Sequence, residues 1–215
     1  MFDLDGTLVD SRRDIADAAN ALLEACGAQP LPQDRIGRMV GDGAAVLVAR
    51  AFAAAGQRPP PDALEQFLGL YNRRLLDHTR PYPGIRETLD ALDGSARLAL
   101  LTNKPLESTR RILDGLDLAR FFTRDAVVGG DGPFPRKPDP SGLLHLAANA
   151  GVSPHDTLLV GDSIIDWRTA RHASSAMCIA RYGFGYEGFP VEQLGATDSV
   201  IDAPTELLSL YRNNT

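Results

Sequence analysis

The sequence predicts an α/β protein with a Rossmann-like parallel-sheet core and an inserted all-helical cap. Short, continuously apolar segments alternate with helical patterns from Pro83 onward, which is typical of a parallel sheet covered on both faces. Between residues 11 and 79, by contrast, every periodic pattern is helical. Acidic pairs also follow two of the predicted strands. We therefore expect a catalytic core formed by residues 1–10 and 80–215 and a helical cap formed by residues 11–79.

Length and charge limit the possible classes of protein. A chain of 215 residues is long enough for one core and a small second domain. Its net charge of −6 argues against non-specific binding to nucleic acid or to an anionic membrane. The first residues do not resemble a signal peptide, and no stretch approaches the ~20 apolar residues of a membrane span. We expect a cytoplasmic protein without nucleic-acid or membrane partners.

The helical insert is expected to begin at Ser11 and to contain three helices. Ser11 and Asp14 have the spacing of a capping box, and Gly27 is placed to end the first helix. A second helix is expected around residues 46–52. Asp62 is expected to cap a third helix that continues towards Leu75. The links to the core would be residues 9–12 and 78–84.

The core pattern predicts strands that alternate with helices along the chain. The strands are expected at residues 98–101, 126–128, 157–160 and 176–180, with a short one near Val200. The helices are expected at residues 85–92, 106–116, 140–150, 164–173 and 205–211. An aromatic loop at residues 182–186 follows a strand end and is a candidate border of a pocket.

Two acidic pairs follow predicted strands. Asp3 and Asp5 alternate along an extended segment and can face one site, while Asp162 and Asp166 lie one helical turn apart after another strand. Ligands of parallel sheets bind at the carboxyl ends of the strands, and clustered carboxylates repel unless a cation neutralises them. Mg²⁺, which prefers oxygen ligands, would do so. The alternatives are an acidic turn for the first pair and a helix cap formed by Asp162 or Ser163 for the second.

Polar residues between the two pairs are candidates for binding phosphate. Thr102 and Asn103 follow an apolar strand and precede a helix, where side chains and free backbone N–H groups can donate to phosphate oxygens. Lys137 precedes two prolines that stiffen its backbone, which suits a cation held in a fixed place. In isolation, a commonplace Thr-Asn turn and a solvated loop lysine are equally open interpretations.

Together these residues resemble the haloacid dehalogenase superfamily. Four of its motifs occur in order, as Asp-x-Asp-Gly-Thr, Leu-Thr-Asn-Lys-Pro, Lys-Pro-Asp-Pro and Gly-Asp-Ser-x-x-Asp. The resemblance covers essentially the whole chain. Val40-Gly41-Asp42-Gly43 and Val128-Gly129-Gly130-Asp131 make the chain most similar to the phosphoglycolate phosphatase branch, although neighbouring sugar-phosphate phosphatases share these features.

The resemblance implies a role for each candidate residue. Asp3 would be the nucleophile and a metal ligand, and Asp5 would be the general acid and base, with its backbone carbonyl on the metal. Asp162 would ligate Mg²⁺, and Asp166 would orient that shell. The phosphoryl group would be held by Thr102, Asn103 and Lys137.

The resemblance also implies that the first strand lies in the centre of the sheet. Because only Met1 and Phe2 precede Asp3, we expect that strand to be short.

The implied activity is Mg²⁺-dependent hydrolysis of a small phosphorylated metabolite, with 2-phosphoglycolate as the first candidate, through an aspartyl phosphate. A β-phosphoglucomutase-like phosphosugar mutase and another sugar-phosphate phosphatase are alternatives within the superfamily. A non-catalytic binding relative is the alternative of a different class. Both a monomer and a homodimer stay open.

Overall fold

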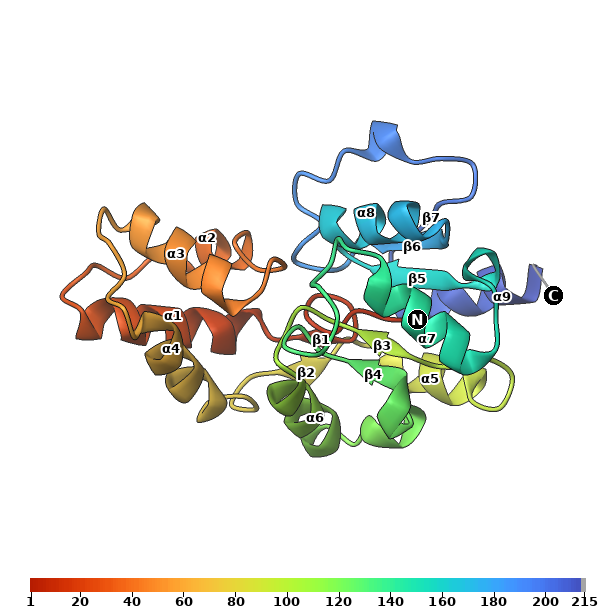
Figure 1. Ribbon diagram of the computed structural model, residues 1–215, viewed down its shortest axis with the longest axis horizontal. Helices are drawn as coiled ribbons and strands as arrows, with labels where there is room; N and C mark the ends of the chain where they lie inside the picture. Colours follow the sequence, from red (N-terminus) through yellow and green to blue (C-terminus); the bar gives the residue numbers. More distant parts are fainter. Residues whose placement is uncertain (214–215) are drawn as a thin grey trace.

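A parallel β-sheet organises the computed structural model, which describes residues 1–213 (Figure 1). Its strands lie in the order β4 (Val127–Val128), β3 (Leu100–Leu101), the segment around Phe2, β5 (Leu158–Gly161), β6 (Ala176–Ala180) and β7 (Ser199–Ile201). All pairings in this sheet are parallel. The predicted α/β class and Rossmann-like core are confirmed, and each predicted strand lies within two or three residues of its expected bounds.

The segment around Phe2 joins the two halves of the sheet. Phe2 bridges Leu100 on one side and Val160 on the other. Its N–H donates to the carbonyl of Ala99 at 2.8 Å, and the N–H of Asp3 donates to the carbonyl of Val160 at 2.9 Å. The expected central position of this segment is confirmed, and its hydrogen bonds place Asp3 between the ends of β3 and β5.

Alternate residues of each strand point to opposite faces of the sheet, as strand geometry requires. Leu100, Val160 and Cys178 belong to one hydrophobic cluster, whereas Leu159 and Met177 belong to the other. The first cluster also takes residues from α5 (Ile85–Leu92), α6 (Leu106–Gly115) and α9 (Leu207–Asn213). The second takes residues from α7 (Ser141–Ala150) and α8 (Ile164–Ala173). Burial on both faces explains why the strands are continuously apolar.

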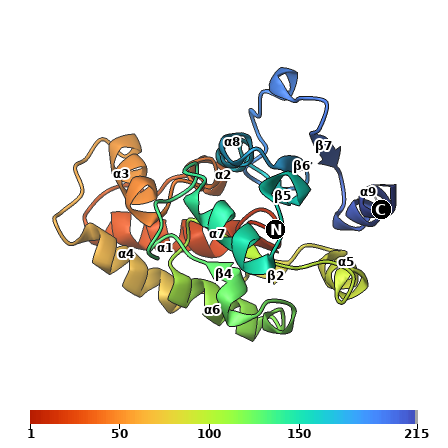
Figure 2. The same ribbon diagram turned by 45° about the vertical axis from the view of Figure 1, so that its right-hand side comes forward.

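The helices between the first motif and the core lie beside the sheet (Figures 1 and 2). They are α1 (Arg12–Ala25), α2 (Gln33–Gly37), α3 (Ala44–Ala54) and α4 (Ala63–Asn72). The all-helical region is thus confirmed, while the short α2 was not predicted because five residues show no helical period. Short 3₁₀ turns complete the chain at Ala119–Phe121, Arg124–Ala126, Pro154–Asp156, Val191–Gln193 and Pro204–Glu206.

Two adjacent linkers connect the helical region to the core. β1 (Val9–Asp10) pairs antiparallel with β2 (Arg80–Pro81), so the outgoing and returning chains run side by side. Asp14, which is 1% exposed, accepts hydrogen bonds from the backbone N–H groups of His78 and Thr79 at 2.8 to 3.0 Å and from the Thr79 hydroxyl at 2.7 Å. The carboxylate therefore ties the start of α1 to the returning linker.

These contacts correct two predictions about helix caps. Ser11 is the N-cap residue of α1 by position, but it makes no capping hydrogen bond, because its hydroxyl donates to Asp5 and Asp14 is engaged by the linker. Asp62 precedes α4 as expected, but its side chain does not cap the backbone and accepts from Gln66 instead. In both cases a competing side-chain partner replaces the local backbone bond.

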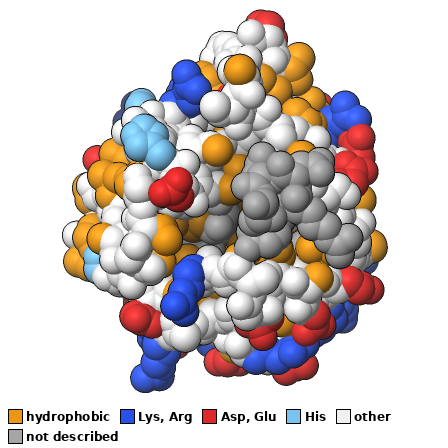
Figure 3. All heavy atoms as spheres, turned by 90° about the vertical axis from the view of Figure 1, so that its right-hand side faces the viewer, with side chains coloured by type: hydrophobic (Ala, Val, Ile, Leu, Met, Phe, Trp, Pro, Cys, Tyr) orange, Lys and Arg blue, Asp and Glu red, His pale blue; other side chains and the backbone are white. Residues whose placement is uncertain are grey.

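None of the described helices combines the length and apolar composition needed to cross a bilayer. Figure 3 shows one face of the core, on which acidic and basic side chains are interspersed over the described part.

Candidate active site

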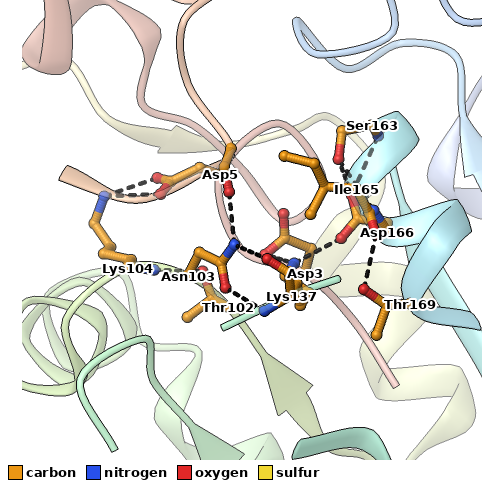
Figure 4. Close-up of polar contacts among 11 residues, drawn as sticks. Asp3, Asp5, Thr102, Asn103, Lys104, Lys137, Ser163, Ile165, Asp166 and Thr169 are labelled. Atoms are coloured by element: carbon orange, nitrogen blue, oxygen red, sulfur yellow. Dashed lines mark hydrogen bonds and ion pairs between the residues drawn. The ribbon is translucent and has the colours of Figure 1, made fainter. Parts of the chain in front are cut away.

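The carboxyl ends of three neighbouring strands carry the site. Asp3 follows Phe2, Thr102 follows β3 and Asp162 follows β5. Because the three strands are parallel and adjacent, their ends meet at one edge of the sheet. Lys137 reaches the same edge from the loop before α7, and Asp166 from the first turn of α8 (Figure 4). All candidate residues from the four motifs are brought to this edge.

Lys137 joins the first acidic pair to the second. Its ammonium Nζ lies 2.8 Å from Asp3 Oδ1 and 2.6 Å from Asp166 Oδ1, and all three side chains are nearly or fully buried. Burial raises the pKa of Asp3 to about 6, although the charge of Lys137 opposes this rise. Burial alone would lower the pKa of Lys137, but attraction to Asp166 and Asp3 raises it, so the lysine is a cation.

Asp162 lies against two glycines that leave room for its carboxylate. The backbone N–H of Gly185 donates to Asp162 Oδ2 at 2.7 Å. Gly6 has φ +84°, and a Cβ there would lie 1.8 Å from the same oxygen. Burial is the main reason that the pKa of Asp162 lies well above its ordinary value. The nearby negative charges of Asp166 and Asp3 raise this pKa further. The two glycines thus allow the backbone to approach a buried carboxylate closely.

Asp166 both caps a helix and belongs to the site. Ser163 and Asp166 form a reciprocal capping box at the start of α8, with the Ser163 N–H and hydroxyl both donating to Asp166 Oδ2. The cap alternative is therefore correct for Ser163 and not for Asp162. Asp166 Oδ1 is taken by Lys137 at 2.6 Å. With both oxygens held by donors of the chain, Asp166 is better placed to orient its neighbours than to ligate an ion directly.

Asp5 faces away from this cluster, towards the helical region. Its carboxylate oxygens lie 2.9 Å from the Nζ of Lys104, and Ser11 donates to Oδ1 at 2.5 Å. The Lys104 ammonium also lies 4.4 Å from the ring centroid of Tyr71, on α4. Burial alone would lower the pKa of Lys104, but Asp5 raises it above its ordinary value, so this lysine is also a cation.

Asn103 organises the loop that carries Lys137. Its amide accepts from the Lys137 N–H at 2.8 Å and donates to the Lys137 carbonyl at 2.9 Å and to the Gly41 carbonyl at 2.8 Å. Thr102 is 3% exposed, and its hydroxyl accepts from the N–H of Lys104. Asn103 therefore holds the site residue Lys137 and touches the helical region, while its role as a phosphate donor stays a prediction.

The cluster has the properties of a divalent-cation site. Carboxylate oxygens of Asp3, Asp162 and Asp166 lie within 4.8 Å of one another, and all three residues are buried. Together with Asp5, these carboxylates outnumber the two lysine ammonium groups by two negative charges. Oxygen ligands and an excess of negative charge fit Mg²⁺. Burial is the main cause of the raised pKa values of Asp3 and Asp162, and neighbouring carboxylates add to it.

A small pocket opens beside the cluster, between the sheet edge and the helical region. Its volume is about 60 Å³, and Asp3, Asp5, Thr102, Asn103 and Asp162 contribute to its wall. The helical region contributes mainly apolar side chains, including those of Val40, Ala44, Leu47, Phe67 and Leu68. Phe184 and Gly185 confirm that the aromatic loop borders the pocket. The size and lining suit a small substrate enclosed by apolar groups.

The sequence motifs include Lys104 but indicate no role for it. They do not identify Ser11 or Tyr71 as site residues. The composition could have drawn attention to Lys104, because the chain has 22 lysines and arginines and only Lys104 and Lys137 are lysines. Tyr71 and Ser11 reach the site through tertiary contacts, and no local pattern marks them.

The family model described as haloacid dehalogenase-like hydrolase matches residues 1–180. Several curated relatives carry the name phosphoglycolate phosphatase. The protein of Nitrosospira multiformis is 39% identical and matches all of this chain and 95% of its own length. The protein of Rhodospirillum rubrum is 42% identical over 91% of this chain and 83% of its own.

Solved structures agree with these similarities. The crystal structure of a predicted phosphoglycolate phosphatase from Haemophilus somnus superposes with a TM-score of 0.89 at 31% identity, covering 98% of this chain and 96% of that one. A second, from Lactobacillus delbrueckii, gives a TM-score of 0.84 at 26% identity, covering 97% and 95%.

Proposed function

Because this chain belongs to the haloacid dehalogenase-like hydrolase family and is a phosphatase of its phosphoglycolate phosphatase-like branch, we propose that it hydrolyses 2-phosphoglycolate through an aspartyl phosphate on Asp3. One observation carries the mechanistic part of the proposal. Asp3 is a buried carboxylate at a strand end, paired with Lys137 at 2.8 Å and close to the carboxylates of Asp162 and Asp166.

Asp3 is proposed to attack the phosphorus atom. A carboxylate and a phosphate dianion repel each other, so the attack needs positive charge and hydrogen-bond donors around the phosphoryl oxygens. Lys137 supplies a fixed charge, and the Thr102 hydroxyl, which accepts from the Lys104 N–H, can donate to these oxygens. Asn103 is proposed to contribute chiefly by holding Lys137, with a phosphate contact as a second role.

Mg²⁺ is proposed to bind at Asp3, Asp162 and the backbone carbonyl of Asp5, with Asp166 orienting this shell through its capping contacts. When bound, Mg²⁺ offsets the excess negative charge of the cluster and the charge of the phosphoryl group.

Asp5 is proposed to protonate the leaving oxygen and later to take a proton from the attacking water. General acid–base help of this kind contributes about 10²–10⁴-fold to the rate. The Ser11 hydroxyl and the Lys104 ammonium fix the orientation of the Asp5 carboxylate. Splitting one hydrolysis into formation and hydrolysis of a covalent intermediate lowers the barrier of each step.

Residues 11–79 are proposed to act as a cap over a core of residues 1–10 and 80–215. The adjacent linkers β1 and β2 would serve as its hinge, and the apolar pocket wall would exclude water from the site. The bond between Asn103 and the Gly41 carbonyl supports a closed arrangement in this structure.

The decisive experiment measures phosphate release from 2-phosphoglycolate with Mg²⁺ for the wild type and for Asp3→Asn. We expect the wild type to release phosphate and the variant to lose activity by several orders of magnitude. A variant that keeps its activity would exclude Asp3 as the nucleophile.

A panel of phosphosugars with the same assay separates the alternatives. Isomerisation of a phosphosugar without free phosphate would indicate a mutase. Absence of both phosphate release and isomerisation for every compound would indicate a binding protein.

A further inference from the structure

A second lysine, Lys104, lines the pocket, and its ammonium pairs with Asp5. Lys137 already serves the phosphoryl side, where it lies between Asp3 and Asp166. Lys104 lies on the other side of Asp5, and its ammonium points towards the Asp5 carboxylate (Figure 4). It also lines the pocket next to the helical region. Among the described residues that line the pocket, Lys104 is the only lysine, arginine or histidine. An anionic group of a ligand that enters this mainly apolar pocket would compete with Asp5 for the Lys104 ammonium.

A second donor stands beside this ammonium. Tyr71 is 3% exposed, and its hydroxyl oxygen is fully buried without a hydrogen-bond partner of normal geometry. Its ring centroid lies 4.4 Å from Lys104 Nζ, so the phenol of α4 and the ammonium of the loop after β3 lie next to each other. Because an ammonium can only donate, its interaction with Tyr71 uses the phenol oxygen as acceptor and leaves the phenol O–H to donate to a ligand.

Resting on the proposed function, we propose that Lys104 and Tyr71 form a subsite for a carboxylate on the non-phosphate end of the substrate. A carboxylate offers two oxygens, which the ammonium and the phenol hydroxyl can each bind. The small pocket volume of about 60 Å³ favours a phosphorylated acid with very few carbons between the two anionic groups.

The composition of the chain agrees with a specific need at this position. Only Lys104 and Lys137 are lysines, whereas the other 20 of the 22 basic residues are arginines. An ammonium is a compact point charge, while a guanidinium is a wide planar group. Both lysines are buried and paired with carboxylates, Lys104 with Asp5 and Lys137 with Asp3 and Asp166, where a compact cation fits more easily than a planar one.

The subsite also explains how the Asp5 carboxylate becomes available for proton transfer to the leaving group. In this structure its two oxygens are held by Lys104 and Ser11, yet the proposed acid must turn one oxygen to the leaving group. A substrate carboxylate that binds Lys104 takes over the charge that Asp5 now compensates. Substrates without a carboxylate leave Asp5 bound to Lys104 and are expected to react more slowly.

The test compares two substrates that differ in one group. 2-Phosphoglycolate and 2-hydroxyethyl phosphate have the same two-carbon skeleton and the same phosphate, but only the first has a carboxylate. We expect the wild type to prefer 2-phosphoglycolate in kcat/KM by roughly 10- to 100-fold, the range of a charge-assisted hydrogen bond. Lys104→Met is expected to abolish this preference, and Tyr71→Phe to reduce it.

Ser11→Ala is the matched control, because it removes another partner of Asp5 without removing a positive charge. It is expected to slow both substrates by the same factor and to keep the preference. An equal loss for both substrates in Lys104→Met would show that Lys104 acts only by holding Asp5, and this would overturn the subsite.

A binding measurement provides a readout without turnover. With ¹³C at the lysine ε-carbons, the protein gives two side-chain signals, one for each lysine. In Asp3→Asn, 2-phosphoglycolate is expected to shift both signals, and 2-hydroxyethyl phosphate only that of Lys137. A Lys104 signal that responds to neither compound would overturn the proposal.

The two proposals fail differently. If the wild type hydrolyses both compounds equally well, the carboxylate subsite is wrong while the phosphatase proposal stands. If it hydrolyses neither compound, both are wrong.

Discussion

Replacing Asp3 by asparagine is expected to stabilise the metal-free protein while removing its activity. Asp3 is 7% exposed, and burial raises its pKa from the ordinary value of 3.8 to about 6. At 1.36 kcal/mol per pKa unit, this rise corresponds to about 3 kcal/mol of destabilisation when the carboxylate is ionised. Asparagine has nearly the same shape without the charge, and Lys137 keeps its partner Asp166 at 2.6 Å.

The sign of the pH dependence follows from the same pKa values. Below about pH 4, Asp3 is protonated in both the folded and the unfolded chain, so wild type and variant should be equally stable. Between about pH 4 and pH 6 the unfolded chain loses its proton first, and the wild type should become progressively less stable than the variant. Above pH 6 the difference should be constant.

Thermal unfolding in EDTA measures this difference. For a chain of this size, about 3 kcal/mol corresponds to a rise in Tm of roughly 6–12 °C at pH 7.5. Added Mg²⁺ should stabilise the wild type more than the variant and so reduce the difference in Tm between them. Asp114→Asn, which removes an exposed carboxylate on α6, is the control and should leave Tm unchanged. A metal-free Asp3→Asn variant that is less stable than wild type, or a gap that does not vary with pH, would refute the reasoning.

Three further predictions concern the hinge, the metal and the glycine turn. Asp14→Ala is expected to lower the free energy of unfolding by about 3–5 kcal/mol, measured in urea, because it leaves buried linker donors unpaired. Chelation is expected to abolish phosphate release, and Mg²⁺ at 100 times its Kd should restore it and stabilise the protein by about 2.7 kcal/mol. Gly6→Ala is expected to lower kcat/KM by about 100-fold, because its Cβ would lie 1.8 Å from Asp162 Oδ2. Gly27→Ala has a similar positive φ with open space around it, so comparable losses in both variants would contradict that explanation.

The strands and the site residues after them were predictable because buried parallel strands leave a strong local pattern. β6 and the helices α5 and α8 have the predicted bounds, since their apolar runs and periods are long enough to be recognised. The capping box expected at Ser11 was wrong for the opposite reason. Its hydroxyl and the Asp14 carboxylate satisfy partners at Asp5 and Thr79, and one of these lies 65 residues away in the sequence.

The sequence by itself determined which chemical groups this protein brings to the strand ends, because the order of strands and the polar residue after each one are local properties. It therefore predicted the acidic pairs, Thr102 and Lys137 as members of one site. Only the tertiary structure decided how these groups are partnered. Lys137 joins Asp3 to Asp166, whereas Lys104 and Tyr71 meet on the far side of Asp5. Such contacts depend on how distant segments pack in three dimensions, and no residue spacing along the chain encodes them.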